Sequence, residues 1–186
     1  MFHKIVKKVA AVALAMAVAG SAIVGNTASA AKSYNCFLMF ADSAWGCQNM
    51  NENVANTSVK NKKGTAKYTV TLKKAQATND GKKGKAKDAK DAAVLCVDIK
   101  GILKDHKAKD LKISNVVVKC DGKVVKTAFN KMAQGQLESK QDPDKYRLEI
   151  YNQYGEGGTS KHPCAKVTAF KWKKSISVSF SLKIKK

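Results

Sequence analysis

Residues 175–184 alternate apolar and polar side chains at every second position. The apolar members of this segment are Ile176, Val178, Phe180, Leu182 and Ile184. Because successive side chains of a β-strand point to opposite faces, the pattern predicts a strand with one buried side and one solvent-facing side. A strand of this kind needs neighbouring strands to pair with and a second layer that covers its apolar face.

Other segments carry the same β-strand pattern. Tyr68–Leu72 and Tyr146–Ile150 alternate in the same way, and the second places Arg147, Glu149 and Tyr151 on its exposed face. Further strands are expected at residues 34–40, 93–99, 111–113 and 167–172. The rest of the chain lacks the 3.6-residue period of a long amphipathic helix. We therefore expect an all-β protein, a single antiparallel β-sandwich of jelly-roll type.

The dipeptide Asp121-Gly122 separates two valine-rich runs and predicts a tight turn. Aspartate and glycine tolerate the positive φ angles of a two-residue type I′ hairpin. Such a turn places Val118 opposite Val125 on the core face. In the same register Cys120 pairs with Lys123 at the edge of the core.

The first thirty residues have the three parts of a secretory signal peptide. Lysines at the start precede the apolar run of residues 9–19, and the small residues 28–30 form a cleavage site. We expect residues 1–30 to be removed and residues 31–186 to form one domain. The expected product is an extracellular monomer without a membrane anchor.

The chain is strongly basic. Its formal net charge is +21, and removing three signal-peptide lysines (21 − 3) leaves +18. This charge favours acidic partners such as anionic polysaccharides or cell-wall polymers. Only Arg147 among the 35 basic residues is an arginine. Because reading a base edge relies on the guanidinium fork, we do not expect sequence-specific nucleic-acid binding.

Residues 73–91 are polar throughout, contain two glycines and predict a long lysine-rich loop. Six of its lysines are candidates for polyanion binding: Lys73, Lys74, Lys82, Lys83, Lys85 and Lys87. The alternative is that the loop is a tolerated surface insertion without a ligand.

Catalytic and metal-binding motifs are absent from the sequence. Five cysteines follow the expected signal peptide, an odd number, and none stands in a Cys-x-x-Cys pair. Neither His106 nor His162 belongs to a hydrolase or metal-ligand motif. We expect a non-enzymatic protein without a cofactor. The alternative is a structural calcium ion held by Asp42, Asp142 and Asp144.

Two segments combine aromatic rings with hydrogen-bonding side chains, as sugar-binding surfaces do. The first, residues 42–49, contributes Asp42 and Trp45. The second, residues 149–155, contributes Glu149, Tyr151, Asn152 and Tyr154. The alternative is that these aromatic rings pack in the core or support loops, as buried tryptophans of β-sandwiches do.

Three segments together resemble small secreted β-sandwich proteins of anaerobic Gram-positive bacteria that look like carbohydrate-binding modules. These segments are residues 37–45, residues 146–152 with Gly155, and residues 175–180. The resemblance implies glycan binding through Asp42, Trp45, Tyr151 and Asn152. The lysine content and the five cysteines depart from the usual look of such modules, which leaves an anionic glycan as a serious target.

We therefore expect a secreted, non-catalytic module that binds extracellular carbohydrate. Two alternatives stay open. The lysine-rich surface is also typical of nonspecific binding to polyanions or to a cell wall. The second alternative is a secreted protein-interaction or inhibitor domain, a function that has no characteristic sequence pattern.

Overall fold

The computed structural model describes residues 32–79, 82–137, 142–155 and 157–185. The expected signal peptide, residues 1–30, lies outside the described residues. Within the described ranges no helix is both long enough and apolar enough to cross a membrane.

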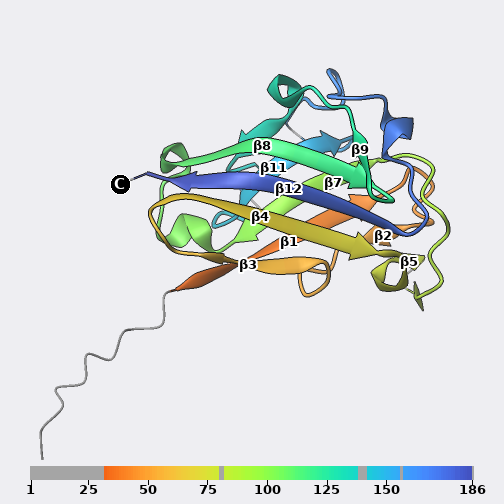
Figure 1. The fold of residues 1–186 in the computed structure, drawn as a ribbon, viewed down its shortest axis with the longest axis horizontal. Coiled ribbons are helices and arrows are strands. Elements are labelled where there is room, and N and C mark those ends of the chain that lie inside the picture. The colour runs from red at the N-terminus through yellow and green to blue at the C-terminus, as the bar shows by residue number, and fades with distance from the viewer. Residues whose placement is uncertain (1–31, 80–81, 138–141, 156, 186) are drawn as a thin grey trace, which may run out of the picture.

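The fold consists of two antiparallel sheets, so the expected all-β sandwich is confirmed (Figure 1). Sheet A contains β10 (Ala133–Gly135), β11 (Tyr146–Asn152), β7 (Val94–Lys100), β1 (Ser33–Ala41), β2 (Gln48–Asn49), β5 (Thr78–Asn79), β6 (Lys82–Lys83) and β3 (Asn56–Lys60), which also pairs with β1. Sheet B contains β4 (Gly64–Lys73), β12 (Ser175–Ile184), β8 (Leu111–Cys120) and β9 (Lys123–Val125). The helical segments are short 3₁₀ turns: η1 (Lys74–Gln76), η2 (Ile102–Lys104), η3 (Ala108–Asp110), η4 (Phe129–Lys131) and η5 (Val167–Phe170).

The core lies between the two sheets and is built from their alternating apolar positions. Phe40, Leu95 and Leu148 of sheet A and Val70 and Val178 of sheet B all belong to one buried cluster. The predicted strand at residues 175–184 is β12, the central strand that pairs with both β4 and β8. Its apolar side faces the core, and Ser175, Ser177 and Ser179 are partly exposed as the alternation predicts, whereas Ser181 is buried.

The predicted hairpin is confirmed in its turn and in its register. Asp121 and Gly122 have φ angles of +50° and +80°, the left-handed values that a type I′ turn requires. Val118 pairs with Val125, and Cys120 pairs with Lys123.

The strand expected at residues 167–172 is wrong. Residues 167–170 form the 3₁₀ turn η5, and beyond it only Trp172 makes a bridge, to Ala89. Phe170 and Trp172 are both buried, because the segment covers the end of the sandwich. The alternating apolar residues of this segment therefore belong to a turn that covers the core, and not to a strand of either sheet.

The expected exposure of Arg147, Glu149 and Tyr151 is also wrong. Arg147 and Glu149 lie on the outer face of sheet A but are buried there. The register of β11 against β7 shifts between Glu149 and Tyr151, which marks a β-bulge. The extra residue turns Tyr151 inward, so its half-buried ring packs against the main core.

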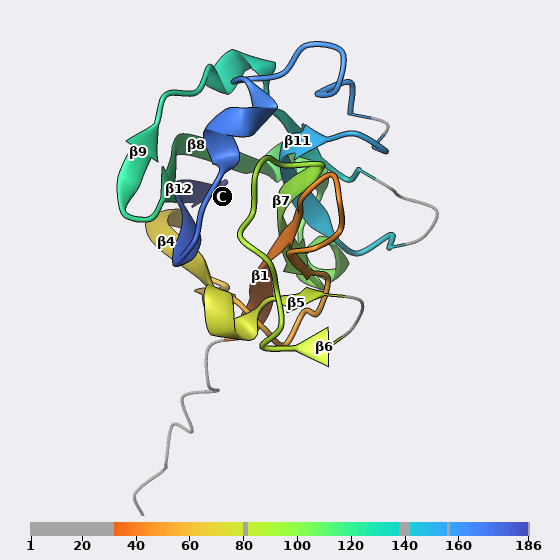
Figure 2. The same ribbon diagram turned by 90° about the vertical axis from the view of Figure 1, so that its right-hand side faces the viewer.

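One end of the sandwich, called the loop end below, collects the segments that carry the candidate residues. Strand β1 ends where β7 begins, since Ala41 pairs with Val94, and β11 ends there too, since Asn152 also pairs with Val94. In sheet B, Ser175 at the start of β12 pairs with Lys73 at the end of β4. Figure 2 views the sandwich from this end, with the connecting loops in front of the two sheets.

Candidate functional site

Two exposed aromatic rings lie side by side at the loop end. Trp45 follows β1 and Tyr154 follows β11, and their ring centroids are 6.0 Å apart with 34° between the ring planes. The indole Nε1 of Trp45 donates a hydrogen bond of 3.4 Å to the hydroxyl oxygen of Tyr154. Trp45 is 37% exposed and Tyr154 is 61% exposed. The fold thus joins the two predicted aromatic segments into one surface.

The turn that presents Trp45 is organised by Asp42. The backbone N–H of Trp45 donates to the carbonyl of Asp42 at 3.0 Å, and the N–H of Cys47 donates to Asp42 Oδ1 at 3.2 Å. Trp45 has a φ angle of +54°, which is uncommon for a residue with a large side chain. Asp42 is buried, so it shapes this turn and does not lie on the aromatic surface.

The loop that presents Tyr154 rests on a buried polar network. Thr159 Oγ1 donates to Glu149 Oε1 at 2.7 Å, and Asn152 Nδ2 donates to Glu149 Oε2 at 3.3 Å. The backbone N–H of Tyr154 in turn donates to Asn152 Oδ1 at 3.1 Å. Glu149, Asn152 and Thr159 are all buried. These side chains therefore hold the loop in place and leave Tyr154 as its exposed ring.

Two glycines allow this loop to pass close to Glu149. A Cβ atom on Gly155 would stand 2.6 Å from Glu149 Oε2 and 2.4 Å from Asn152 Nδ2. A Cβ atom on Gly157 would stand 2.4 Å from Glu149 Oε1. Neither position accepts a side chain without moving the buried carboxylate.

The six candidate residues for sugar binding therefore have three different placements. Trp45 and Tyr154 form the exposed surface. Asp42, Glu149 and Asn152 are buried supports of the two loops, and Tyr151 packs against the core. The sequence patterns found both loops but did not separate the exposed residues from the supporting ones.

The lysine-rich loop runs beside the Trp45 turn. The backbone N–H of Lys87 donates to the carbonyl of Gly46 at 2.7 Å. Ser43 donates to the Asp91 carboxylate through its backbone N–H at 2.8 Å and its hydroxyl at 2.7 Å. The exposed Lys87 is thereby anchored next to the aromatic pair.

The other lysine candidates differ in their surroundings. Lys73, Lys82 and Lys85 are exposed, whereas Lys74 is half-buried and bonds Asp88 Oδ1 at 2.7 Å. The side chain of Lys83 lies outside the described residues. Lys74 is thus committed to an ion pair, while Lys73, Lys82 and Lys85 extend the basic surface.

A second basic cluster at the loop end was not found from the sequence. Lys90, Lys123, Lys171 and Lys173 surround a pocket of about 550 Å³. They come from three segments that are far apart in the chain, and in a lysine-rich sequence no local pattern distinguishes them from other surface lysines.

All five described cysteines are buried. Burial raises the pKa of Cys47 and Cys120 to about 12 and the pKa of Cys164 to about 11. The thiol of Cys164 also donates to the carbonyl of Ile150 at 3.4 Å. Cys47, Cys120 and Cys164 are therefore protonated at neutral pH and pack as small apolar side chains.

The three aspartates considered for calcium do not meet. Asp42 lies at the loop end, whereas Asp142 and Asp144 precede β11 at the opposite end and pair with Lys145 and Lys104. In the part of the chain that the structure describes, no group of three or more His, Cys, Asp or Glu residues could hold a metal ion.

Comparisons with known proteins found no matching family model, no matching curated protein and no matching solved structure.

Proposed function

We propose that this protein is a secreted, non-catalytic binding module for extracellular carbohydrate. The observation that supports the proposal is the exposed pair formed by Trp45 and Tyr154, with ring centroids 6.0 Å apart. Sugar rings present apolar C–H faces that pack on aromatic side chains, and their hydroxyls need hydrogen-bonding partners nearby. The pair supplies apolar ring surface and, at its edge, the hydroxyl of Tyr154.

The construction of the two loops also favours a binding role. Asp42 fixes the turn under Trp45, and Glu149 with Asn152 fixes the loop of Tyr154. A preorganised surface loses less conformational entropy when it binds a ligand. The positive φ angle of Trp45 carries a conformational cost that the Asp42 turn sustains, as is common at ligand-binding sites.

The lysines around the pair favour a carbohydrate that carries negative charge. Lys87 is exposed and its backbone is anchored to Gly46, the neighbour of Trp45. Long-range attraction from such lysines raises the rate at which an anionic chain reaches the surface. The aromatic pair then supplies the short-range selectivity for a sugar ring.

The proposal is tested by calorimetric titration of the protein with neutral and uronic-acid polysaccharides at physiological salt. Trp45→Ala and Tyr154→Ala should each weaken binding by about tenfold or more, as loss of a central aromatic contact does. Phe129→Ala is the matched control, because Phe129 is 38% exposed and Trp45 is 37% exposed. Binding that is absent for the unmodified protein, or equally weak in all three variants, would overturn the proposal.

A second candidate function is nonspecific polyanion binding by charge alone, which the exposed Lys73, Lys82 and Lys85 favour. Its affinity should fall steeply and linearly on a log–log plot against salt concentration. It should also survive Trp45→Ala. A triple Lys82→Gln, Lys85→Gln, Lys87→Gln variant separates the two functions, because it should weaken charge-driven binding but leave binding to a neutral glycan unchanged.

A further inference from the structure

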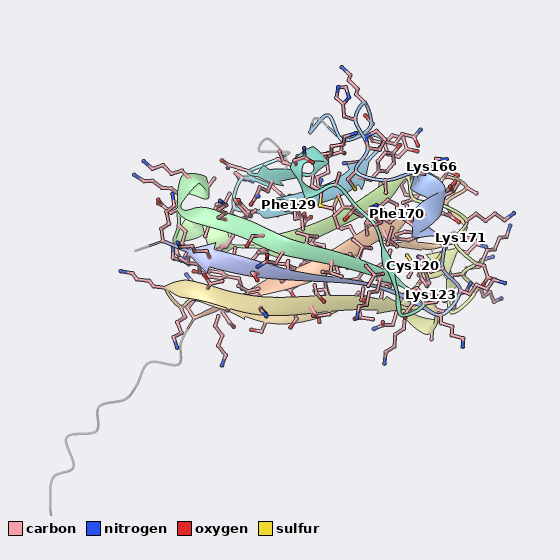
Figure 3. All side chains as sticks on the ribbon, turned by 45° about the horizontal axis from the view of Figure 1, so that its top comes forward. Cys120, Lys123, Phe129, Lys166, Phe170 and Lys171 are labelled. Carbon is pink, nitrogen blue, oxygen red and sulfur yellow. The ribbon has the colours of Figure 1, made fainter. Side chains whose placement is uncertain are left out.

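The pocket bordered by lysines at the loop end has an apolar floor. Ala89, Cys120 and Trp172 line this floor, and all three are buried residues. The pocket measures about 550 Å³, within the range of small-molecule sites, which is roughly 300–1,000 Å³. Figure 3 labels Cys120 and Lys123 of the β8–β9 hairpin and Lys171 after η5, at the same end of the sandwich.

The floor is held by a backbone bridge between two loop segments. The N–H of Ala89 donates to the carbonyl of Trp172 at 3.0 Å, and the N–H of Trp172 donates back to Ala89 at the same distance. The ring of Trp172 also packs edge-on against Phe40, with centroids 5.4 Å apart. The floor of the pocket is therefore held in place by contacts within the protein, without a ligand.

The negative charges at the pocket are already committed to internal bonds. Asp88 accepts a hydrogen bond of 2.7 Å from Lys74, and this bond is the main reason why the pKa of Asp88 lies below its ordinary value. Asp121 accepts backbone N–H groups from residues 173–175. These two carboxylates offset only part of the positive charge of the four lysines that line the pocket.

Three lysines at the rim have no such partner. Among the described residues, no ion pair joins Lys90, Lys123 or Lys171 to an acid, while Lys173 has only a 4.0 Å contact with Asp88. Bringing like charges together disfavours the folded state unless an anion neutralises them. The pocket thus carries an excess of positive charge around an apolar surface.

The wall also contains an unpaired hydrogen-bond donor. The buried indole N–H of Trp172 lacks a hydrogen-bond partner in the part of the chain described. Buried side-chain polar atoms are rarely left without a partner. This buried donor belongs to a residue that lines the pocket.

We propose that this pocket binds a small amphipathic carboxylate, an anion with an aliphatic or aromatic body. Its body packs on the floor formed by Ala89, Cys120 and Trp172, and its carboxylate lies among Lys90, Lys123 and Lys171. A neutral apolar molecule leaves the lysines uncompensated, and a purely polar anion leaves the floor unfilled.

The pocket is distinct from the aromatic surface proposed for carbohydrate. No lining residue of the pocket belongs to the Trp45–Tyr154 pair. The two sites are therefore tested separately, and failure of one leaves the other standing.

The fluorescence of Trp172 reports on the pocket directly. The chain contains two tryptophans, so Trp45→Phe leaves Trp172 as the single emitter. We expect octanoate to change this emission in a saturable titration. Acetate lacks the apolar body and octanol lacks the charge. Each should bind at least about tenfold more weakly than octanoate, a difference of about 1.4 kcal/mol.

Paired lysine variants in the Trp45→Phe background locate the site. Lys123→Gln with Lys171→Gln should weaken octanoate binding by about tenfold, as loss of charge-assisted contacts does. Lys112→Gln with Lys183→Gln is the matched control. These two exposed lysines are cross-strand neighbours on β8 and β12, at the end of the sandwich away from the pocket. The proposal is overturned by a titration that does not saturate, by octanol binding as tightly as octanoate, or by equal losses in the two double variants.

Discussion

Trp45 and Tyr154 are separated by 109 residues in the chain, yet their side chains meet in a hydrogen bond of 3.4 Å. Neither loop alone offers more than one exposed ring. The pair exists because β1 and β11 are the two neighbours of β7 in sheet A and both end at the loop end. The geometry of the surface thus depends on the buried residues that fix the two loops.

Gly157→Ala should disturb this geometry without touching the aromatic rings. The new methyl group would meet Glu149 Oε1 at 2.4 Å, a distance that the buried carboxylate must relieve by moving. We expect a loss of about 1–3 kcal/mol in the free energy of unfolding, the usual cost of overpacking. Urea denaturation measures this loss, and carbohydrate binding should weaken in parallel.

Gly46→Ala is the control for this substitution. Its methyl group would meet only the flexible side chain of Lys87, at 3.2 Å from Cδ, which can turn away into solvent. We expect a change of less than about 0.5 kcal/mol, because only this flexible side chain has to move. If the two alanine variants were equally stable, the close packing of Gly157 on Glu149 would be refuted.

The parts of the fold that were predictable rest on local rules. The alternation in residues 175–184 identifies β12, and the Asp121-Gly122 turn fixes the register of the β8–β9 hairpin. In both cases the information lies within about ten neighbouring residues, so no knowledge of the tertiary structure is needed.

The parts that were not predictable depend on tertiary contacts. A β-bulge after Glu149 turns Tyr151 toward the core, and a bulge leaves no mark in an alternating sequence. Residues 167–170 form a 3₁₀ turn that covers the end of the sandwich, a placement that only the tertiary structure sets. Likewise, the sequence placed Trp45 and Tyr154 in two separate segments, and only the order of strands in sheet A brings them together.

Mutation of the buried charge network on sheet A should cause a large loss in the free energy of unfolding. Arg147 donates from Nε to Asp98 Oδ1 at 2.7 Å and from Nη2 to Oδ2 at 2.8 Å, and Lys145 Nζ lies 3.1 Å from Oδ2. Asp98→Ala removes the carboxylate that both buried cations share. The expected cost is about 3–5 kcal/mol in the free energy of unfolding, because an uncompensated buried charge is left behind.

An exposed ion pair provides the comparison. Lys100 and Glu52 are 2.6 Å apart, but their side chains are 44% and 39% exposed. Glu52→Ala should therefore cost less than about 1 kcal/mol. Chemical denaturation of both variants decides the matter: an Asp98→Ala cost as small as that of Glu52→Ala would contradict the network described.

The cysteines should be inert in the folded protein. Burial raises the pKa of Cys47 and Cys120 to about 12, so the reactive thiolate is scarce and shielded from reagents. Under native conditions a disulfide reagent at mildly alkaline pH should react slowly with these thiols. In the urea-unfolded chain all 5 thiols should be exposed and react quickly. Fewer than 5 thiols in the unfolded, unreduced protein would mean that a disulfide has formed.

The stability of the hairpin end should depend on pH through Asp121. Partial desolvation pushes the pKa of this carboxylate upward, but hydrogen bonds from the backbone N–H groups of Lys174, Ser175 and Lys173 outweigh it and hold the pKa below its ordinary value. A lowered folded-state pKa contributes stability above the unfolded value of about 3.9, and this stability is lost as pH falls through the folded value.

Asp121→Asn isolates this contribution. Asparagine tolerates the φ angle of +50°, so the turn is retained while the charge is removed. Because the carboxylate is exposed and its interactions are screened, we expect a loss on the order of 1 kcal/mol at neutral pH. The difference between the two proteins should shrink below about pH 4, where the aspartate of the unmodified protein becomes protonated. Urea titrations at neutral and acidic pH measure it, and a difference that stays constant across this range would show that the charge of Asp121 does not stabilise the fold.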